Sequence, residues 1–143
     1  MTIERDRGGF TLVELAVVIV IIGVLAAFGI PRFRDAVERS KAGEAVNYLG
    51  SLATAQERYH SRQGTYADAV TKLDIKMSAT KYFVVGTIAA GSTGNIEDSW
   101  TLTLTRTGAA AGFGPYTVTF TEQGYDKANS TLDQLPEINP MGT

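Results

Sequence analysis

Hydrophobic side chains dominate the stretch from Phe10 to Ile30, where the only charged residue is Glu14. A helix of these 21 residues rises about 30 Å at ~1.5 Å per residue, which matches the hydrocarbon core of a bilayer. The pattern therefore predicts a membrane-spanning helix. A secretory signal peptide is the alternative, but its apolar region has about 7 to 15 residues and precedes a cleavage site with small residues. Here the small pair Gly8 and Gly9 comes before the apolar run.

Beyond Pro31 the helical period continues, but the apolar residues now occupy only one face. They recur at steps of three, four and seven residues, and charged residues take the other faces. The apolar positions are Val37, Ala45, Tyr48, Leu49, Leu52, Ala55 and Tyr59, and the charged positions are Arg34, Glu38, Glu44, Glu57 and Arg58. This periodicity predicts an amphipathic helix that ends near Arg62, with Gly64 as its stop.

Alternation with a period of two replaces the helical period in three later runs. These are KYFVVGTIA at 81–89, WTLTLTRT at 100–107 and YTVTFTE at 116–122. In the last two, apolar residues alternate with threonines, which is typical of strands with one face on a core and a threonine face in water. A short helix fits 67–73, and no regular element is expected at 122–143. The whole pattern predicts an α+β fold, in which a long N-terminal helix packs on an antiparallel sheet of three or four strands.

Composition narrows the classes of function that remain. The chain has 143 residues and no cysteine, so its one small domain must be held by packing alone. After Pro31 there are 11 Lys and Arg residues against 12 Asp and Glu. No basic field therefore draws the domain to nucleic acid or to anionic lipid, and no nucleic-acid partner is expected.

Catalysis is not expected either. His60 is the only histidine, and near a helix end a histidine more often interacts with the terminal carbonyls than acts as a base. The sequence contains no cysteine nucleophile and none of the strings G-x-S-x-G, H-E-x-x-H or G-K-[ST]. We expect no enzyme and no cofactor.

Glu14 is the candidate functional residue of the apolar stretch. An ionised carboxylate in hydrocarbon costs at least ~2.5 kcal/mol, so an acid inside a membrane span indicates a function and a partner. The alternative is a glutamate close enough to the end of the span to stay in the interface.

The sequence GFTLVE at 9–14, followed by an apolar helix with Pro31 at its far end, resembles the type IV filament prepilins. This family includes the type IV pilins and the type II secretion pseudopilins. The resemblance implies that a prepilin peptidase cuts after Gly9 and methylates the new amino terminus at Phe10, and that Glu14 is the acid used in assembly. It divides the chain into a leader at 1–9, a membrane and filament-core helix at 10–31, an amphipathic helix at 32–62 and a globular region at 63–143.

The same resemblance implies a structural subunit that polymerises through its hydrophobic helix into a homo-oligomeric helical filament. The precursor would lie in the bacterial inner membrane, meet an assembly platform there, and leave as an extracellular or periplasmic filament. Two alternatives remain open: a major pseudopilin of type II secretion, and a membrane-anchored binding module that does not polymerise.

Pro31 predicts a weak turn in the long helix. A proline removes one backbone donor and crowds the carbonyl four residues back, and Gly23 and Gly29 lie nearby. These features predict a kink between Gly23 and Pro31, and the resemblance implies local melting of this segment in a filament.

The basic residues around the span conflict with that topology. Arg5 and Arg7 precede the span, whereas Arg32, Arg34, Arg39 and Lys41 follow it closely. The positive-inside rule alone would place the domain in the cytoplasm. The processing site resembles one that is cut on the cytoplasmic side, and on that basis we place the domain outside.

The C-terminal region departs from the family pattern, because many pilins close it with a disulfide and this chain has no cysteine. Asp126, Asn129, Ser130 and Asp133 are weak candidates for a calcium site. Their spacing is not that of an EF-hand loop, and a solvated loop is the favoured interpretation.

Overall fold

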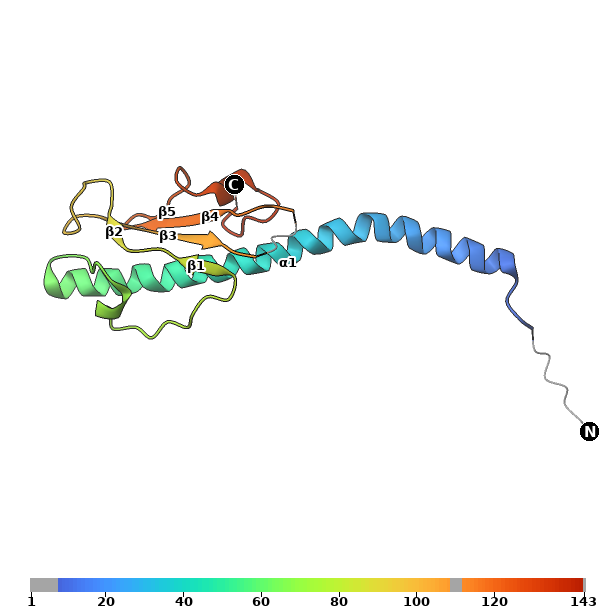
Figure 1. Cartoon of the computed structure of the whole chain (residues 1–143), viewed down its shortest axis with the longest axis horizontal. Helices are drawn as coiled ribbons and strands as arrows, with labels where there is room; N and C mark the ends of the chain where they lie inside the picture. Colours follow the sequence, from blue (N-terminus) through green and yellow to red (C-terminus); the bar gives the residue numbers. More distant parts are fainter. Residues whose placement is uncertain (1–7, 109–111, 143) are drawn as a thin grey trace, which may run out of the picture. The chain divides into compact units, whose positions relative to one another are not determined.

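The computed structural model describes residues 8–108 and 112–142. Most of the expected leader, residues 1–7, therefore lies outside the described residues. The chain forms two compact units, Met1–Arg34 and Asp35–Thr143, which we describe one at a time (Figure 1).

One helix, α1 (Leu12–Gln63), contributes to both units and includes Pro31. It ends one residue beyond the expected Arg62. Gly64 adopts a φ of +75°, and its N–H donates to the carbonyl of His60 at 2.8 Å, so the expected glycine stop is confirmed.

In the first unit, α1 is apolar on all sides from Leu15 to Ile30. By length and composition it could cross a membrane, since its most apolar window has a mean hydropathy of 2.8 and none of that window is buried within the subunit. Every large hydrophobic side chain from Phe10 to Phe33 is 49 to 86% exposed. This surface has no partner within the described part of its own chain.

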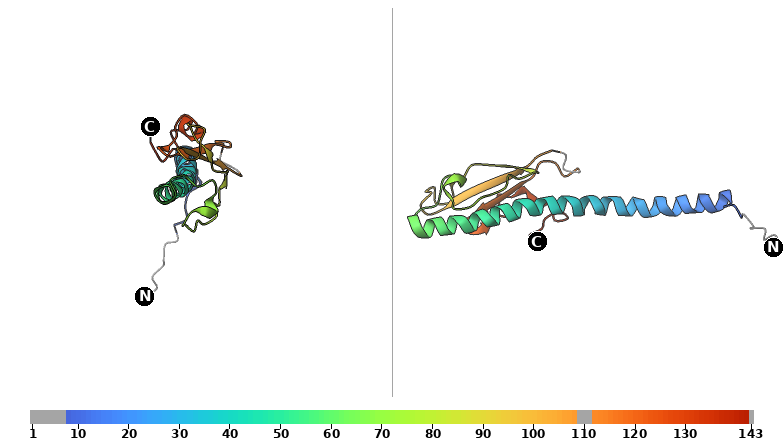
Figure 2. Two further views of the ribbon diagram at one scale, coloured as in Figure 1. Left: turned by 90° about the vertical axis from the view of Figure 1, so that its left-hand side faces the viewer. Right: turned by 90° about the horizontal axis from the view of Figure 1, so that it is seen from below.

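In the second unit, one face of α1 packs against a sheet (Figure 2). The fully buried apolar residues on this face are Ala42, Ala45, Leu49, Leu52 and Ala55. The predicted amphipathic face is therefore confirmed from Ala45 onward. Val37 was placed on that face, but its side chain is 37% exposed.

The sheet is antiparallel throughout, in the order β1-β3-β4-β5, with β2 also paired to β3. Its strands are β1 (Phe83–Val85), β2 (Ala89–Ala90), β3 (Trp100–Arg106), β4 (Thr117–Thr121) and β5 (Gly124–Tyr125). The run at 81–89 thus forms two short strands rather than one. Between them the N–H of Gly86 donates to the carbonyl of Thr103 at 3.0 Å. A Cβ at Gly86 would lie 2.7 Å from that oxygen, so only glycine permits this close approach.

The apolar face of the sheet follows the predicted alternation. Trp100, Leu102 and Leu104 of β3 are buried, as are Val118 and Phe120 of β4. Gln56 of α1 adds a polar contact that ties the following loop to this core. Its side-chain amide donates to the carbonyl of Ala67 and accepts from the N–H of Ala67, both at 2.8 Å. The short helix expected at 67–73 is a single 3-10 turn, Val70–Lys72.

The threonine face is only partly in water, contrary to the prediction. Thr119 is 2% exposed, because the segment after β5 lies over it. The hydroxyl of Thr119 donates to the carbonyl of Asn129 at 3.0 Å, and the hydroxyl of Ser130 accepts from the N–H of Thr119 at 2.9 Å. Thr131 accepts from the N–H of Thr117 in the same way, at 2.8 Å.

The C-terminal region is therefore a packed element and not a solvated loop. It contains a 3-10 turn, Thr131–Gln134, and Leu132, Ile138 and Asn139 are fully buried. No regular element was expected at 122–143, which is wrong at β5 and at this 3-10 turn. The solvated loop favoured for the calcium candidates is wrong at Ser130, which is 3% exposed, because side-chain hydroxyls here supply backbone partners that no local pattern reveals. This docking closes the region without a disulfide.

We expect Ser130→Ala to lower the free energy of unfolding by about 1–3 kcal/mol, since it leaves the buried N–H of Thr119 without a partner. Urea unfolding of the fragment Asp35–Thr143 measures this loss. Ser78→Ala is the matched control, because Ser78 is exposed and should change stability by less than about 0.5 kcal/mol. Equal stability of both variants would show that the hydroxyl contact does not hold the C-terminal region.

Candidate functional site

The first unit places Glu14 in a reciprocal cap at the start of α1. The N–H of Thr11 donates to Oε2 of Glu14 at 2.8 Å, and the N–H of Glu14 donates to the Thr11 hydroxyl at 3.2 Å. The Thr11 hydroxyl also lies 3.1 Å from Oε2. This arrangement is a capping box, in which two unpaired donors of the helix start are satisfied at once. The string T-x-x-E before an apolar run is its sequence signature and could have predicted it.

The expected cleavage bond, between Gly9 and Phe10, lies just before this cap. Gly8 to Phe10 have no regular secondary structure and are exposed, and the Phe10 side chain is 86% exposed. Added Cβ atoms at Gly8 or Gly9 would meet no atom within 4 Å. The bond is therefore open to a processing enzyme in the described subunit.

The segment from Gly23 to Pro31 is helical at every residue. Gly23 and Gly29 face open space, so no contact within the described residues explains their small size. Its melting on assembly concerns the filament and stays a prediction.

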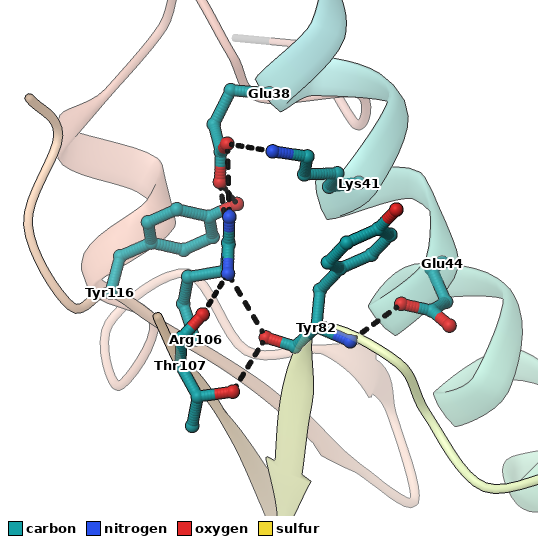
Figure 3. A network of polar contacts seen from close by, with 7 residues as sticks. All are labelled: Glu38, Lys41, Glu44, Tyr82, Arg106, Thr107 and Tyr116. Atoms are coloured by element: carbon teal, nitrogen blue, oxygen red, sulfur yellow. Dashed lines mark hydrogen bonds and ion pairs between the residues drawn. The ribbon is translucent and has the colours of Figure 1, made fainter. Parts of the chain in front are cut away.

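The second unit contains a buried polar network that the sequence did not predict (Figure 3). Glu38 is 0% exposed, although the helical period placed it on a solvent face. Its carboxylate accepts from Nε of Arg106 at 2.5 Å and from the hydroxyl of Tyr116 at 2.9 Å. Lys41 adds a third donor at 3.2 Å. A clue was present in the sequence, since Arg106 continues the inward-facing series Trp100, Leu102 and Leu104.

The network also holds the start of β1. Arg106 donates from Nη1 to the carbonyl of Tyr82 at 3.3 Å and to the carbonyl of Thr107. Glu44 accepts from the N–H groups of Lys81 and Tyr82 at 2.9 and 3.3 Å. These contacts join α1, β1 and β3 at one end of the sheet.

The charges in the network support one another. Burial alone would raise the pKa of Glu38, but hydrogen bonds from Arg106, Tyr116 and Lys41 outweigh burial and lower the pKa below its ordinary value of 4.5. Burial, together with the negative charge of Glu38, raises the pKa of Tyr116. Glu38 is therefore ionised and Tyr116 is a neutral donor at neutral pH.

Two of the four calcium candidates, Asp126 and Asn129, bond to each other. Asp126 accepts from the N–H and the side-chain amide of Asn129 at 3.1 and 2.7 Å. Asp133 accepts from Asn139 at 3.4 Å. Among the described residues no three His, Cys, Asp or Glu side chains gather as metal ligands. His60 stacks on Tyr66 with ring centroids 4.3 Å apart, in place of the expected contact with terminal carbonyls.

Both units of the chain match known protein families. Residues 31–130 match the family described as "Type IV minor pilin ComP, DNA uptake sequence receptor", and residues 5–30 match the "Prokaryotic N-terminal methylation motif". The chain is 38% identical over 112 residues to the fimbrial protein EcpC of Eikenella corrodens, which covers 77% of this chain and 71% of EcpC.

Two shorter matches involve proteins from other bacteria. The type IV major pilin protein PilA of Myxococcus xanthus is 45% identical over 69 residues, which covers 48% of this chain and 31% of PilA. A fimbrial protein of Pseudomonas aeruginosa is 47% identical over 53 residues, 37% of this chain and 34% of that protein. The chain thus spans about a third of the length of these two relatives.

We expect Glu38→Gln to lower the free energy of unfolding of the fragment Asp35–Thr143 by about 3–5 kcal/mol at pH 7, because it removes the negative charge of a buried ion pair. The folded-state pKa of Glu38 lies below the unfolded value. The carboxylate therefore adds stability above pH ~4.5, and this contribution is lost as the pH falls through the folded-state pKa.

The difference between wild type and Glu38→Gln should accordingly shrink between pH 7 and pH 3 in urea unfolding. Glu97→Gln, at an exposed position, is the control and should change stability by less than about 0.5 kcal/mol at both pH values. A Glu38→Gln deficit of the same size at both pH values would contradict an ionised, paired Glu38.

Proposed function

Because this chain belongs to the type IV pilin family, we propose a mechanism by which it is processed and assembled into a filament. The protein is a structural subunit of a pilus filament and not an enzyme. Members of the family are processed by a prepilin peptidase and assemble into filaments. Our proposal concerns the residues that carry these steps here: cleavage after Gly9, methylation of Phe10, and assembly through Glu14.

The uncovered apolar surface of α1 supports this mechanism. A contiguous apolar surface of this size is not stable in water and requires lipid or other apolar helices around it. Before assembly, lipid of the inner membrane covers it. In the filament, equivalent helices of neighbouring subunits replace the lipid, and the small residues Gly23, Ala26 and Ala27 allow close approach.

Glu14 gives this packing its register. Removal of the leader frees an amine on Phe10, and in a bundle of parallel helices this amine can meet the Glu14 carboxylate of the next subunit. Either charge alone in hydrocarbon costs at least ~2.5 kcal/mol, so pairing favours the one stagger that joins them. In the single subunit the Thr11 cap satisfies the same carboxylate, which reduces the cost of holding Glu14 in the membrane until a partner arrives.

We expect Glu14→Ala to lower the yield of sheared surface filaments by about tenfold or more in a strain where this is the main subunit, since a loss of ~1.4 kcal/mol per contact already changes an equilibrium tenfold. The precursor should still enter the membrane and be cut after Gly9. Immunoblots of membrane and sheared fractions, with intact mass of the membrane form, measure both steps.

Glu97→Ala removes the same charge at an exposed position of the second unit and should leave filament yield unchanged. Normal filaments from Glu14→Ala would refute the role of this acid in assembly. A membrane form that still begins at Met1 would refute cleavage after Gly9. Transfer of the wild-type subunit from the membrane to the sheared fraction should depend on an assembly platform in the inner membrane.

A second candidate function, as a minor subunit that binds DNA, is favoured by the match of residues 31–130 to a family described as a DNA uptake sequence receptor. Five of the nine described Lys and Arg residues of the second unit take part in ion pairs. Arg58 and Arg62 pair with Asp74, Lys72 pairs with Asp68, and Lys41 and Arg106 pair with Glu38. Lys81 is exposed and lies 5.3 Å from the ring centroid of Tyr82. A lysine beside an aromatic ring suits a phosphate and an adjacent base.

If this second function holds, the full processed chain in detergent should bind a fluorescent 20-base-pair duplex. Lys81→Gln should weaken binding and reduce the slope of log affinity against log salt by about 1. Lys127→Gln, at another exposed lysine, is the matched control and should do neither. Absence of wild-type binding at low salt would exclude this function and leave the filament role intact.

A further inference from the structure

Two exposed arginines, Arg32 and Arg34, follow the apolar surface of the first unit directly. Phe33 lies between them and is 69% exposed. Within the part of the chain that the structure describes, neither arginine takes part in an ion pair. The nearly neutral charge of the residues after Pro31 thus hides a local positive excess at the end of the span.

The nearby acids do not remove this excess. Asp35 and Glu38 are the first two acids along the chain after Ile30. The Glu38 carboxylate is already bound by Arg106, Tyr116 and Lys41 in the buried network. Of these two acids, only Asp35 is left to offset the positive charges of Arg32 and Arg34.

The positions of the arginines along the helix fix their depth. When Phe10 to Ile30 fills the hydrocarbon core, Arg32 lies about 3 Å and Arg34 about 6 Å beyond its edge, at ~1.5 Å per residue. This is the headgroup layer, where arginine side chains and aromatic rings are favoured. Sliding the helix inward would bring both guanidinium groups into hydrocarbon, which is strongly disfavoured.

The directions of the two side chains distinguish between possible ligands. Residues two apart on an α-helix point about 200° apart, at ~100° per residue. Arg32 and Arg34 therefore lie on opposite sides of α1 and cannot grip one phosphate together. A protein or nucleic acid docked on one side would meet only one of them, whereas lipid surrounds a single helix on all sides.

We propose that Arg32 and Arg34 each bind the phosphate of an anionic phospholipid in the leaflet on the domain side, and that they hold the unassembled subunit at a fixed depth. This inference rests on the proposed function, because it assumes a processed subunit in a membrane. It also accounts for the positive-inside conflict. Cleavage after Gly9 removes Arg5 and Arg7, so the arginines that remain near the span all lie on the domain side, where anionic lipid offsets the charge.

The test uses the full processed chain, unassembled, in phosphatidylcholine vesicles that contain spin-labelled phosphatidylglycerol or spin-labelled phosphatidylcholine. Electron spin resonance measures the fraction of each lipid held at the protein. We expect a preference for phosphatidylglycerol of about fivefold per arginine, the equivalent of ~1 kcal/mol each, at low ionic strength. Addition of 0.5 M NaCl should reduce it.

Arg32→Gln combined with Arg34→Gln should abolish this preference. Lys76→Gln combined with Lys127→Gln removes the same charge at exposed positions of the second unit and should keep the preference. Both double variants are first shown to float with the vesicles. An unchanged preference in the double arginine variant would overturn the proposal.

Inorganic phosphate at the ionic strength of the NaCl sample distinguishes a second source of the anion. Loss of the preference with phosphate, beyond the loss with NaCl, would mean that the arginines bind free phosphate and would also overturn the proposal. None of these readouts requires filaments. A failed lipid test therefore leaves the filament role standing, and failure of Glu14 in the filament assay leaves the lipid result standing.

Discussion

An apolar helix surface that its own chain does not cover is the constraint on which the rest of this pilin depends. The hydrophobic side chains from Phe10 to Phe33 stay exposed in the single subunit, and burial of each is worth about 1.5–3 kcal/mol. Their sum exceeds the stability of a typical domain several times. The subunit must therefore exchange one apolar environment, the bilayer, for another, the bundle of helices in a filament. From Phe10 to Ile30 the single charged residue, Glu14, is the feature that can select a register.

The second unit has to withstand this exchange with no disulfide. Its stability comes from the packing of α1 on the sheet and from two separate sets of polar contacts. Glu38, Arg106 and Tyr116 join α1 to β3 and to the residue before β4. Ser130 and Thr131 fasten the C-terminal segment to β4 through their hydroxyls. Each set of contacts supplies hydrogen-bond partners to buried polar groups that would otherwise oppose folding.

The sequence predicted the elements whose signals are local. The end of α1 just before Gly64 follows from a glycine stop, and β3 and β4 follow from strict alternation of apolar residues and threonines. The apolar residues of β3 and β4 also identified the core correctly. By contrast, the split of the first strand depends on how closely Gly86 approaches Thr103, which is a property of the paired strands and not of one run.

Most of what escaped prediction depends on partners far away in the sequence. Glu38 is buried because Arg106 and Tyr116, 68 and 78 residues later, come to meet it, and helical periodicity contains no information about them. The C-terminal segment is packed because Thr119 donates hydrogen bonds to Asn129 and Ser130. Alternation alone predicts that the face of the sheet with Thr119 is exposed to water. The contact between Thr11 and Glu14 also escaped prediction, although it is local and the four-residue string T-x-x-E indicates it.

A reconstruction of the assembled filament at side-chain resolution tests the central claim most directly. The mechanism predicts that the Glu14 carboxylate of each subunit lies within about 4 Å, the limit of an ion pair, of the Phe10 amine of a neighbouring subunit. It also predicts lost helical hydrogen bonds between Gly23 and Pro31. Glu14 bonded only to Thr11 of its own chain, with the neighbouring amine elsewhere, would contradict it.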